Sequence, residues 1–269
     1  MTTAYAAAPL HSALLTEMPG VCHAITRKMA GLGRADGNIG FSAPRDRADA
    51  WEMRQRWCAT AGLNAEQLVT LGQVHGRVAH VARAWHAGWG ARPGSAQIGH
   101  GDALVTNAAG PVLLTLHADC QPVLFVDPAR NGHGPVVAVA HAGWRGTVAD
   151  VAGNTLAIMR QRFGTRAADV HVYLGPAIGP CCYVVGAEVA AAWQDVAGSD
   201  AAVALAAHGD RHRFSLSAGN AWLLAQAGVL PAHIECSGVC TRCQGEQWFS
   251  HRGQGPHTGR FGAMIAIGG

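Results

Sequence analysis

Three short apolar runs between residues 112 and 142 constrain the fold most strongly. Val112–His117 alternates as a half-buried strand does, while Val123–Val126 and Val136–Val139 are rich in β-branched residues. The turn-rich stretch DPARNGHGP separates the last two runs, so they are expected to form neighbouring strands. Pairing of these strands would bring Cys120 and His141 close together in space, at the ends of two strands.

The rest of the chain predicts further elements around these strands. We expect helices over Arg45–Gly62, Thr147–Phe163, Ala187–Ala197 and Ser217–Gly228, and a strand over Val170–Leu174. Gln67–Ala84 alternates like two strands around a turn, with His75 at the corner. Short strands are expected in the tail after residue 233.

Length and composition predict one globular domain with a sizeable core. The chain has 269 residues, of which 49% are hydrophobic and 14% charged, which is not the composition of a disordered protein. We expect residues 1–20 to form a loosely held N-terminal arm or an edge strand, and residues 21–269 to form a single catalytic domain.

Several classes of partner are disfavoured. Lys28 is the only lysine among twenty basic residues, and no basic run is interleaved with aromatic residues, so no nucleic-acid partner is expected. No run of eighteen apolar residues occurs, and the first twenty residues lack a signal-peptide pattern. We therefore expect a cytoplasmic protein without a membrane partner. An exposed tryptophan-rich loop at Trp85–Trp89 leaves either a monomer or a weak homo-oligomer as the expected state.

The eight cysteines of such a chain indicate thiols or metal ligands rather than disulfides. Cys240 and Cys243 form a CxxC pair, with Cys236 upstream, but a structural zinc site usually needs two such pairs. The adjacent Cys181 and Cys182 form a pair with poor chelating geometry. These cysteines are therefore expected to be buried or redox-innocent thiols.

His75, Cys120 and His141 make a better set, because each lies at a strand end beside a glycine- or proline-marked corner. Three nitrogen and sulfur ligands leave a tetrahedral zinc ion one open position, as in catalytic sites. The same set suits copper. A metal-free alternative uses Cys120 as nucleophile and His141 as base, with Asp102 or Asp119 as the acidic orienter. Spacing alone does not separate these three possibilities.

Eight motifs, in order over residues 20–268, carry a resemblance to a known family. They are TLGQVHG, GDALVT, HADCQPVL, AHAGWRGT, LGPAIGPCCYVVG, CTRC, FSHR and HTGRF. The chain resembles the YfiH-like proteins, also called laccase-domain or multicopper polyphenol oxidase proteins. The resemblance implies that the family's metal triad falls on His75, Cys120 and His141. It also implies an α+β fold of mixed β-sheets flanked by helices, similar to the cytotoxic necrotizing factor deamidases.

The activity that the resemblance implies is zinc-dependent phosphorolysis of purine nucleosides. Adenosine, inosine and S-methyl-5′-thioadenosine are the implied substrates with phosphate, and adenosine deamination is a companion activity. The older family label implies copper-dependent phenol oxidation, and some bacterial members are linked to peptidoglycan editing. A true multicopper enzyme usually supplies ligands as HxH pairs, and this sequence has none.

Phosphorolysis needs an anion clamp, for which arginine is suited because its planar fork matches phosphate oxygens. The candidate clamp residues are Arg27, Arg54, Arg145, Arg252 and Arg260. The reaction also needs a carboxylate as a proton shuttle, and Asp119 is the acidic residue nearest to the triad in the sequence. On a continuing strand Asp119 would point away from Cys120, so it is equally expected to orient the loop from behind.

Overall fold

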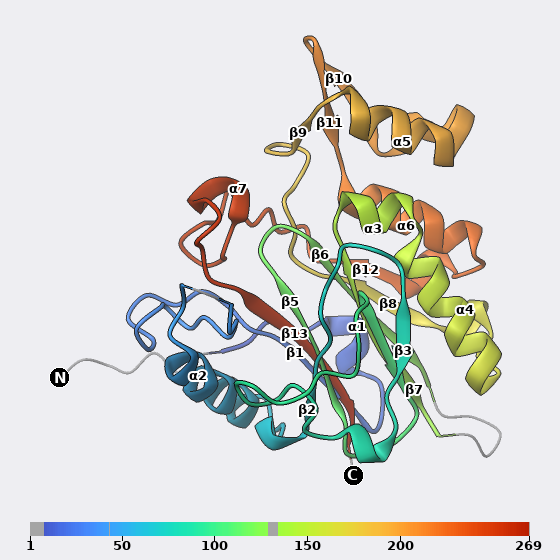
Figure 1. The fold of residues 1–269 in the computed structure, drawn as a ribbon. Coiled ribbons are helices and arrows are strands. Elements are labelled where there is room, and N and C mark those ends of the chain that lie inside the picture. The colour runs from blue at the N-terminus through green and yellow to red at the C-terminus, as the bar shows by residue number, and fades with distance from the viewer. Residues whose placement is uncertain (1–7, 43, 129–133, 269) are drawn as a thin grey trace.

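The computed structural model describes residues 8–42, 44–128 and 134–268, which form three β-sheets with helices around them (Figure 1). The strands are β1 (Val21–Ile25), β2 (Leu68–Val69), β3 (Ala79–Val81), β4 (Ala103–Thr106), β5 (Val112–His117), β6 (Gln121–Asp127), β7 (Val136–Ala142), β8 (His171–Leu174), β9 (Val184–Val185), β10 (Leu205–His208), β11 (Arg211–Phe214), β12 (Ile234–Cys236) and β13 (Phe261–Ile267). The α-helices are α1 (Ala13–Thr16), α2 (Arg47–Thr60), α3 (Trp144–Val148), α4 (Val151–Phe163), α5 (Ala187–Ala197), α6 (Leu216–Gln226) and α7 (His251–Gln254).

Two of the sheets pack face to face and form the centre of the molecule. A four-stranded sheet has the order β1-β13-β5-β2, and a six-stranded sheet has the order β12-β8-β6-β7-β4-β3. Both sheets are mixed, since β2 pairs with β5, β3 with β4, and β12 with β8 in parallel, while the other pairs in these two sheets are antiparallel. The buried side chains between them include Ile25, Leu113 and Ile265 from one sheet and Leu104, Leu124 and Val139 from the other.

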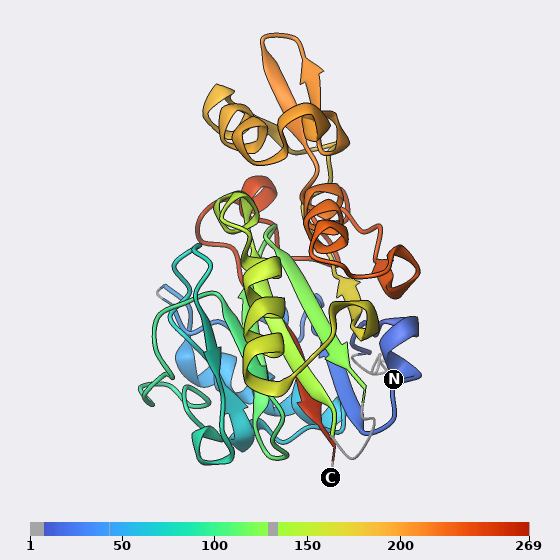
Figure 2. The ribbon, with the colours of Figure 1, turned by 90° about the vertical axis from the view of Figure 1, so that its right-hand side faces the viewer.

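Helices cover the outer faces of both sheets. Helix α2 packs Met53 and Trp57 onto the outer face of the four-stranded sheet. Helices α4 and α6 cover the six-stranded sheet, as the view in Figure 2 shows. Strands β6 and β7 are therefore buried on both faces, which explains why their sequences are nearly continuous apolar runs. The predicted mixed sheets flanked by helices are confirmed.

The predicted pairing at the centre of the chain is also confirmed. Strands β6 and β7 are antiparallel neighbours, and Pro122 lies opposite His141 in their register. Cys120 immediately precedes β6, so it lies beside the end of β7. The turn-rich stretch predicted between these strands includes residues 129–133, which lie outside the described residues.

One predicted helix is wrong in detail, because Thr147–Phe163 is divided between α3 and α4. Asp150 separates the two helices in the left-handed region, with a φ of 58°. Its carboxylate accepts a hydrogen bond from the backbone N–H of Gly153 at 2.9 Å and so begins α4 as an N-cap. A short acidic residue tolerates this conformation. The spacing of apolar residues continues across it, so the pattern does not predict the break between the two helices.

The predicted hairpin over Gln67–Ala84 is a crossing between sheets instead. Strand β2 pairs with β5 in the four-stranded sheet, whereas β3 pairs with β4 in the six-stranded sheet. His75 does lie at a corner, with a φ of 61°. The crossing places this corner beside the ends of β5 and β7, where the polar residues gather.

Two other regions complete the architecture. Residues 8–20 are held rather than loose, since Leu15 is fully buried and the Ser12 hydroxyl donates to Glu235 at 2.6 Å. A third sheet, β10-β11-β9, packs with α5 around Trp193 and Phe214 and stands above the central sheets in Figures 1 and 2. Among the described helices, none combines the length and apolar character that crossing a membrane requires.

Candidate active site

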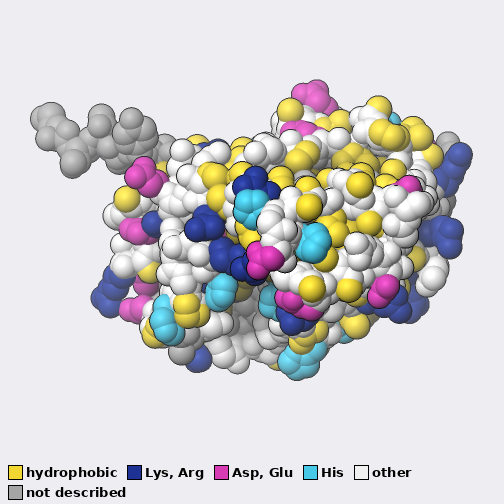
Figure 3. Space-filling model, turned by 90° about the horizontal axis from the view of Figure 1, so that it is seen from above, with side chains coloured by type: hydrophobic (Ala, Val, Ile, Leu, Met, Phe, Trp, Pro, Cys, Tyr) yellow, Lys and Arg dark blue, Asp and Glu magenta, His cyan; other side chains and the backbone are white. Residues whose placement is uncertain are grey.

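A pocket of about 700 Å³ opens where several loops meet at the ends of the central strands. Its lining includes His75, Cys120, His141, Trp144, Arg145, Ile178, Tyr183, His251, Arg252 and Arg260. Seen from above, histidine and basic side chains gather around the middle of this face of the molecule (Figure 3). The volume falls within the range of small-molecule sites.

The three predicted metal ligands come together at the base of this pocket. The ligand atoms of His75, Cys120 and His141 all lie within 4.8 Å of one another. The His75 and His141 rings meet edge to face, with centroids 4.9 Å apart. A Cβ atom on Gly143 would lie 2.8 Å from the Cys120 sulfur, which gives a steric reason for glycine in the HAGW motif.

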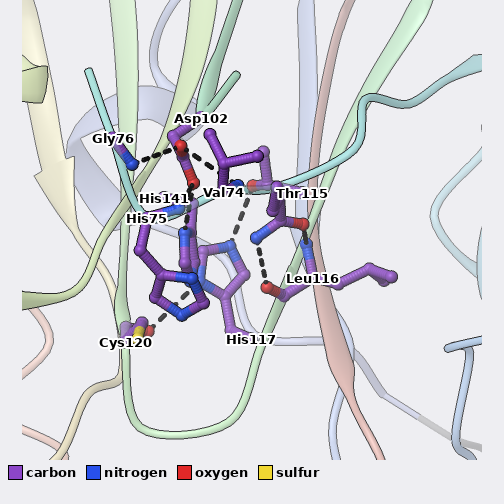
Figure 4. A network of polar contacts seen from close by, with 10 residues as sticks. Val74, His75, Gly76, Asp102, Thr115, Leu116, His117, Cys120 and His141 are labelled. Carbon is purple, nitrogen blue, oxygen red and sulfur yellow. Dashed lines mark hydrogen bonds and ion pairs between the residues drawn. The ribbon is translucent and has the colours of Figure 1, made fainter. Parts of the chain in front are cut away.

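A fully buried carboxylate, Asp102, holds two of these residues in place (Figure 4). Its oxygens accept hydrogen bonds from the backbone N–H groups of His75 at 3.0 Å and Gly76 at 2.6 Å. Asp102 also lies 2.9 Å from Nδ1 of His141, which leaves Nε2 of this ring for the pocket. Burial raises the pKa of Asp102, but hydrogen bonds from His141 and Gly76 bring it below its usual value.

The importance of Asp102 was underestimated from the sequence, where it entered only as an orienter in the metal-free alternative. The signal that could have found it is the GDALVT motif, which places an acidic residue directly before a buried strand. Such a carboxylate behind a ligating histidine fixes the tautomer and direction of the ring.

Charge also couples Cys120 to His141. Burial raises the pKa of Cys120, but the charge of His141 and hydrogen bonds from His141 and His75 lower it to about 6. Burial lowers the pKa of His141, but the Cys120 thiolate and the bond to Asp102 raise it to about 9. Both shifts favour the thiolate form of Cys120, which is the form that binds metals. One sulfur and two nitrogen donors that face a pocket fit a tetrahedral ion with one open position.

A second buried histidine, His117, supports the site from behind. Its ring lies 2.8 Å from the Thr115 hydroxyl and 3.1 Å from the carbonyl oxygen of Cys120 (Figure 4). Burial is the main reason why its pKa lies well below the usual value, and the neighbouring His141 lowers it further. A neutral His117 thus fixes the backbone of Cys120.

Asp119 lies in the bend between β5 and β6, with a φ of 86°. The strand geometry that would turn it away from Cys120 does not apply here. One carboxylate oxygen accepts a bond from the Thr241 hydroxyl at 2.7 Å, and the other accepts from the backbone N–H of Arg252 at 2.6 Å. Asp119 borders the pocket while it ties the β5–β6 bend to the segment of residues 240–252.

Three of the five candidate arginines line the pocket, namely Arg145, Arg252 and Arg260. Arg145 lies over the ring of Trp144, with its guanidinium carbon 4.3 Å from the ring centroid. Arg252 donates to the carbonyl oxygen of Val184 at 3.0 Å. Arg260 donates to two neighbouring backbone carbonyls and keeps the rest of its fork for other partners.

The other two candidates, Arg54 and Arg27, are not among the residues that line this pocket. Arg54 is only 3% exposed and donates to the backbone carbonyls of Ile39, Gly90 and Ala91, so it holds loops together. Arg27 lies over the ring of Trp248, 5.4 Å from its centroid. Periodicity does not distinguish an arginine that binds carbonyls from one that binds a ligand.

Comparison with known proteins places this pocket in a family context. Residues 22–268 match the family described as "Multi-copper polyphenol oxidoreductase laccase". The chain is 32% identical over 250 residues to "Purine nucleoside phosphorylase YlmD" of Geobacillus stearothermophilus, covering 91% of this chain and 90% of that protein. It is 36% identical over 253 residues to "Purine nucleoside phosphorylase" of Deinococcus radiodurans, covering 92% and 89%.

Solved structures show the same likeness. The crystal structure of YlmD from Geobacillus stearothermophilus superposes with a TM-score of 0.87 at 31% identity, covering 94% of this chain and 93% of that one. The crystal structure of Bacillus licheniformis hypothetical protein YfiH gives a TM-score of 0.85 at 29% identity and covers 92% of each chain. The predicted fold is confirmed by both.

Proposed function

The chain belongs to the multi-copper polyphenol oxidoreductase laccase family, and from that premise we propose that it is a zinc-dependent purine nucleoside phosphorylase. Its proposed substrates are adenosine, inosine and S-methyl-5′-thioadenosine, with adenosine deamination as a side activity. The names of relatives that align with about nine-tenths of the chain support the proposal. The observation that carries it is one pocket in which His75, Cys120 and His141 lie together with three arginines.

In phosphorolysis a phosphate oxygen bonds to C1′ of the ribose while the bond from C1′ to the purine nitrogen breaks. The electron pair leaves with the purine, which takes up a proton. The protein must therefore hold an anion beside the sugar and stabilise charge as it develops. Arg145, Arg252 and Arg260 are the proposed phosphate ligands, because their cationic forks share the pocket with the triad.

A zinc ion held by His75, Cys120 and His141 would supply a Lewis-acidic positive charge next to these arginines. The purine is proposed to lie against the apolar part of the lining, to which Ile178 and Tyr183 contribute. Asp119 is proposed to act mainly by holding the backbone of Arg252, since both of its carboxylate oxygens are engaged.

A metal-free cysteine hydrolase is the second candidate, because Asp102, His141 and Cys120 are arranged as orienter, base and thiolate. A chelator separates the two proposals, since it abolishes the activity of a metal enzyme and spares that of a cysteine hydrolase. The family description also makes a copper-dependent phenol oxidase an alternative function. Stoichiometric copper, with oxidation of a phenol, in protein purified without added metal would favour that activity over zinc.

The proposal is tested by incubating the three nucleosides with the purified protein, with and without phosphate, and separating the products by chromatography. We expect release of the free base only when phosphate is present, together with slower ammonia release from adenosine. A His141→Ala variant should lose both activities. Release of neither base nor ammonia from any nucleoside would refute the proposed function.

We also propose that the protein works in the cytoplasm. All eight cysteines are free thiols in the structure, which suits a reducing compartment.

A further inference from the structure

A second cluster of metal-capable side chains lies outside the triad. The sulfur atoms of Cys181, Cys182, Cys240 and Cys243 all lie within 4.8 Å of one another. Cys243 is 3.5 Å from Cys181 and 3.4 Å from Cys182, sulfur to sulfur. Of these four thiols only Cys240 is buried, so burial does not account for the other three.

The pairing of two strands explains how distant cysteines meet. Strands β8 and β12 are parallel neighbours, and the chain continues this pairing beyond their ends. An isolated parallel bridge joins Ala177 to Cys240, and the N–H of Thr241 donates to the carbonyl of Ala177 at 3.0 Å. The segments of residues 177–183 and 239–243 therefore run side by side, which brings the adjacent pair of cysteines to the CxxC pair.

We propose that Cys181, Cys182, Cys240 and Cys243 bind one zinc ion in a closed tetrahedral site. Zinc–thiolate bonds of about 2.3 Å in a tetrahedron place the sulfur atoms roughly 3.8 Å apart. This value lies between the two short sulfur–sulfur distances and the 4.8 Å upper limit for the cluster. Small side-chain movements would therefore bring all four sulfur atoms to the distances that one zinc ion needs. Four protein ligands leave no open position, which is typical of a structural ion.

The surroundings of the cluster suit a metal-bound thiolate group. The backbone N–H of Gly179 donates to the Cys240 sulfur at 3.2 Å. A Cβ atom on Gly179 would lie 3.3 Å from the Cys181 sulfur and 3.1 Å from Cβ of Cys240, so glycine leaves the cluster room. Arg242 lies within the CxxC pair and donates to the carbonyl of Cys182 at 3.4 Å, which places a cation beside the negative site.

A disulfide is the competing use of these thiols. It needs sulfur atoms about 2.05 Å apart and consumes cysteines in pairs. All four sulfurs lie within 4.8 Å of one another, and Cys243 is 3.4 and 3.5 Å from two partners at once, which suits ligands of one ion better than bonded pairs.

The proposed ion would hold one wall of the pocket without entering it. The segment with Cys181 and Cys182 also carries Ile178 and Tyr183, and the segment with Cys240 and Cys243 leads to Arg252. Joining the two segments at one ion fixes these lining residues relative to each other. The role is therefore structural, and it is independent of which reaction the pocket performs.

The test is elemental analysis of protein purified under reducing conditions without added metal. We expect the double variant Cys181→Ser, Cys243→Ser to contain one zinc ion per chain fewer than the wild type. A His75→Ala, His141→Ala variant should keep this ion, so failure of the pocket site is distinguished from failure of the cysteine site. Cys236→Ser is the matched control, because this exposed thiol lies outside the cluster.

Two further measurements, which leave the four cysteines unchanged, keep the proposal testable if the Cys181→Ser, Cys243→Ser variant does not fold. Cobalt substitution should give the visible absorption of a tetrahedral cobalt–thiolate centre, and this absorption should persist in the His75→Ala, His141→Ala variant. A thiol reagent should modify four further cysteines once a strong chelator has removed the metal from that variant. Equal zinc contents in wild type and Cys181→Ser, Cys243→Ser, iron in place of zinc, or disulfides within the cluster would overturn the proposal.

Discussion

The two walls of the pocket are built differently. One wall is made of the ends of the central strands and the β2–β3 crossing, which carry Cys120, His141 and His75, and the buried carboxylate of Asp102 holds the two histidines. The other wall is made of loops and the short helix α7, which carry Ile178, Tyr183 and Arg252. We refer to them as the strand wall and the loop wall.

The difference shows how this fold divides its tasks. Groups that share one ion must keep their positions to within a fraction of an ångström, and paired strands with buried hydrogen bonds provide that precision. Loops tolerate more variation, so they are suited to the contacts that select a substrate. The loop wall is nevertheless held in place. Asp119 connects it to the β5–β6 bend through two hydrogen bonds, and the cysteine cluster joins its two segments to each other.

The largest effect is expected from Asp102→Asn, which removes the charge behind the strand wall. Asparagine has one oxygen to accept hydrogen bonds, so it cannot serve both His141 and the N–H groups of His75 and Gly76. We expect the pocket to bind zinc about 10–100-fold more weakly, with a comparable loss of turnover. Competition with a chromophoric chelator measures the affinity.

The exposed Asp200→Asn is the matched control for charge and should change neither quantity. The ion proposed for the cysteine cluster should also remain in Asp102→Asn. Unchanged zinc affinity in this variant would show that the strand wall does not depend on its buried carboxylate.

A smaller effect is expected from Arg252→Ala on the loop wall. If Arg252 binds phosphate, its removal raises the KM for phosphate by roughly tenfold, because a hydrogen bond to a charged group contributes about 1.5 kcal/mol at the lower end of its usual range. Zinc content should not change. Arg27→Ala serves as the control, since Arg27 lies away from the pocket lining. Equal increases of the KM in both variants would remove Arg252 from the phosphate site.

Asp119→Asn probes the tie between the two walls. The amide still accepts from one partner but presents a donor to the other, either the Thr241 hydroxyl or the N–H of Arg252. We expect a few-fold rise in the KM for phosphate and a small change in kcat, as measured by steady-state kinetics over a range of pH. Loss of one limb of the pH profile with an unchanged KM would instead make Asp119 a proton shuttle.

The strand wall was largely predictable from the sequence. The alternation of Val112–His117 matches β5, and the β-branched runs indicated β6 and β7. Because paired antiparallel strands bring their ends together, the sequence alone was enough to place Cys120 near His141. Glycine-marked corners then indicated His75 as their companion.

The loop wall was not predictable in the same way. Its cysteines meet because β8 and β12 pair in parallel, and a two-residue period does not specify which strand is the partner. Likewise Arg54 and Arg252 look alike in sequence, yet one binds buried carbonyls and the other lines the pocket. The short strands β9, β10 and β11 also escaped prediction, because no strong apolar period marks them.

The smallest effect is expected from Gly179→Ala, which presses on the cysteine cluster without removing a ligand. The new Cβ would approach Cys240 and Cys181 to 3.1 and 3.3 Å, so the two segments must move apart slightly. Overpacking of this kind costs about 1–3 kcal/mol, which lowers the Tm of a chain of this size by roughly 2–10 °C. Differential scanning calorimetry measures the change.

Gly134→Ala is the matched control, because no described residue lies within 4 Å of its new Cβ and its backbone is not in the left-handed region. If the cluster binds zinc, the difference in Tm between Gly179→Ala and Gly134→Ala should become smaller after the metal is removed, because segments without a shared ion separate more easily. An unchanged Tm in Gly179→Ala would mean that the two segments of the loop wall move apart at little cost in free energy. The cysteine cluster would then not hold the loop wall rigidly.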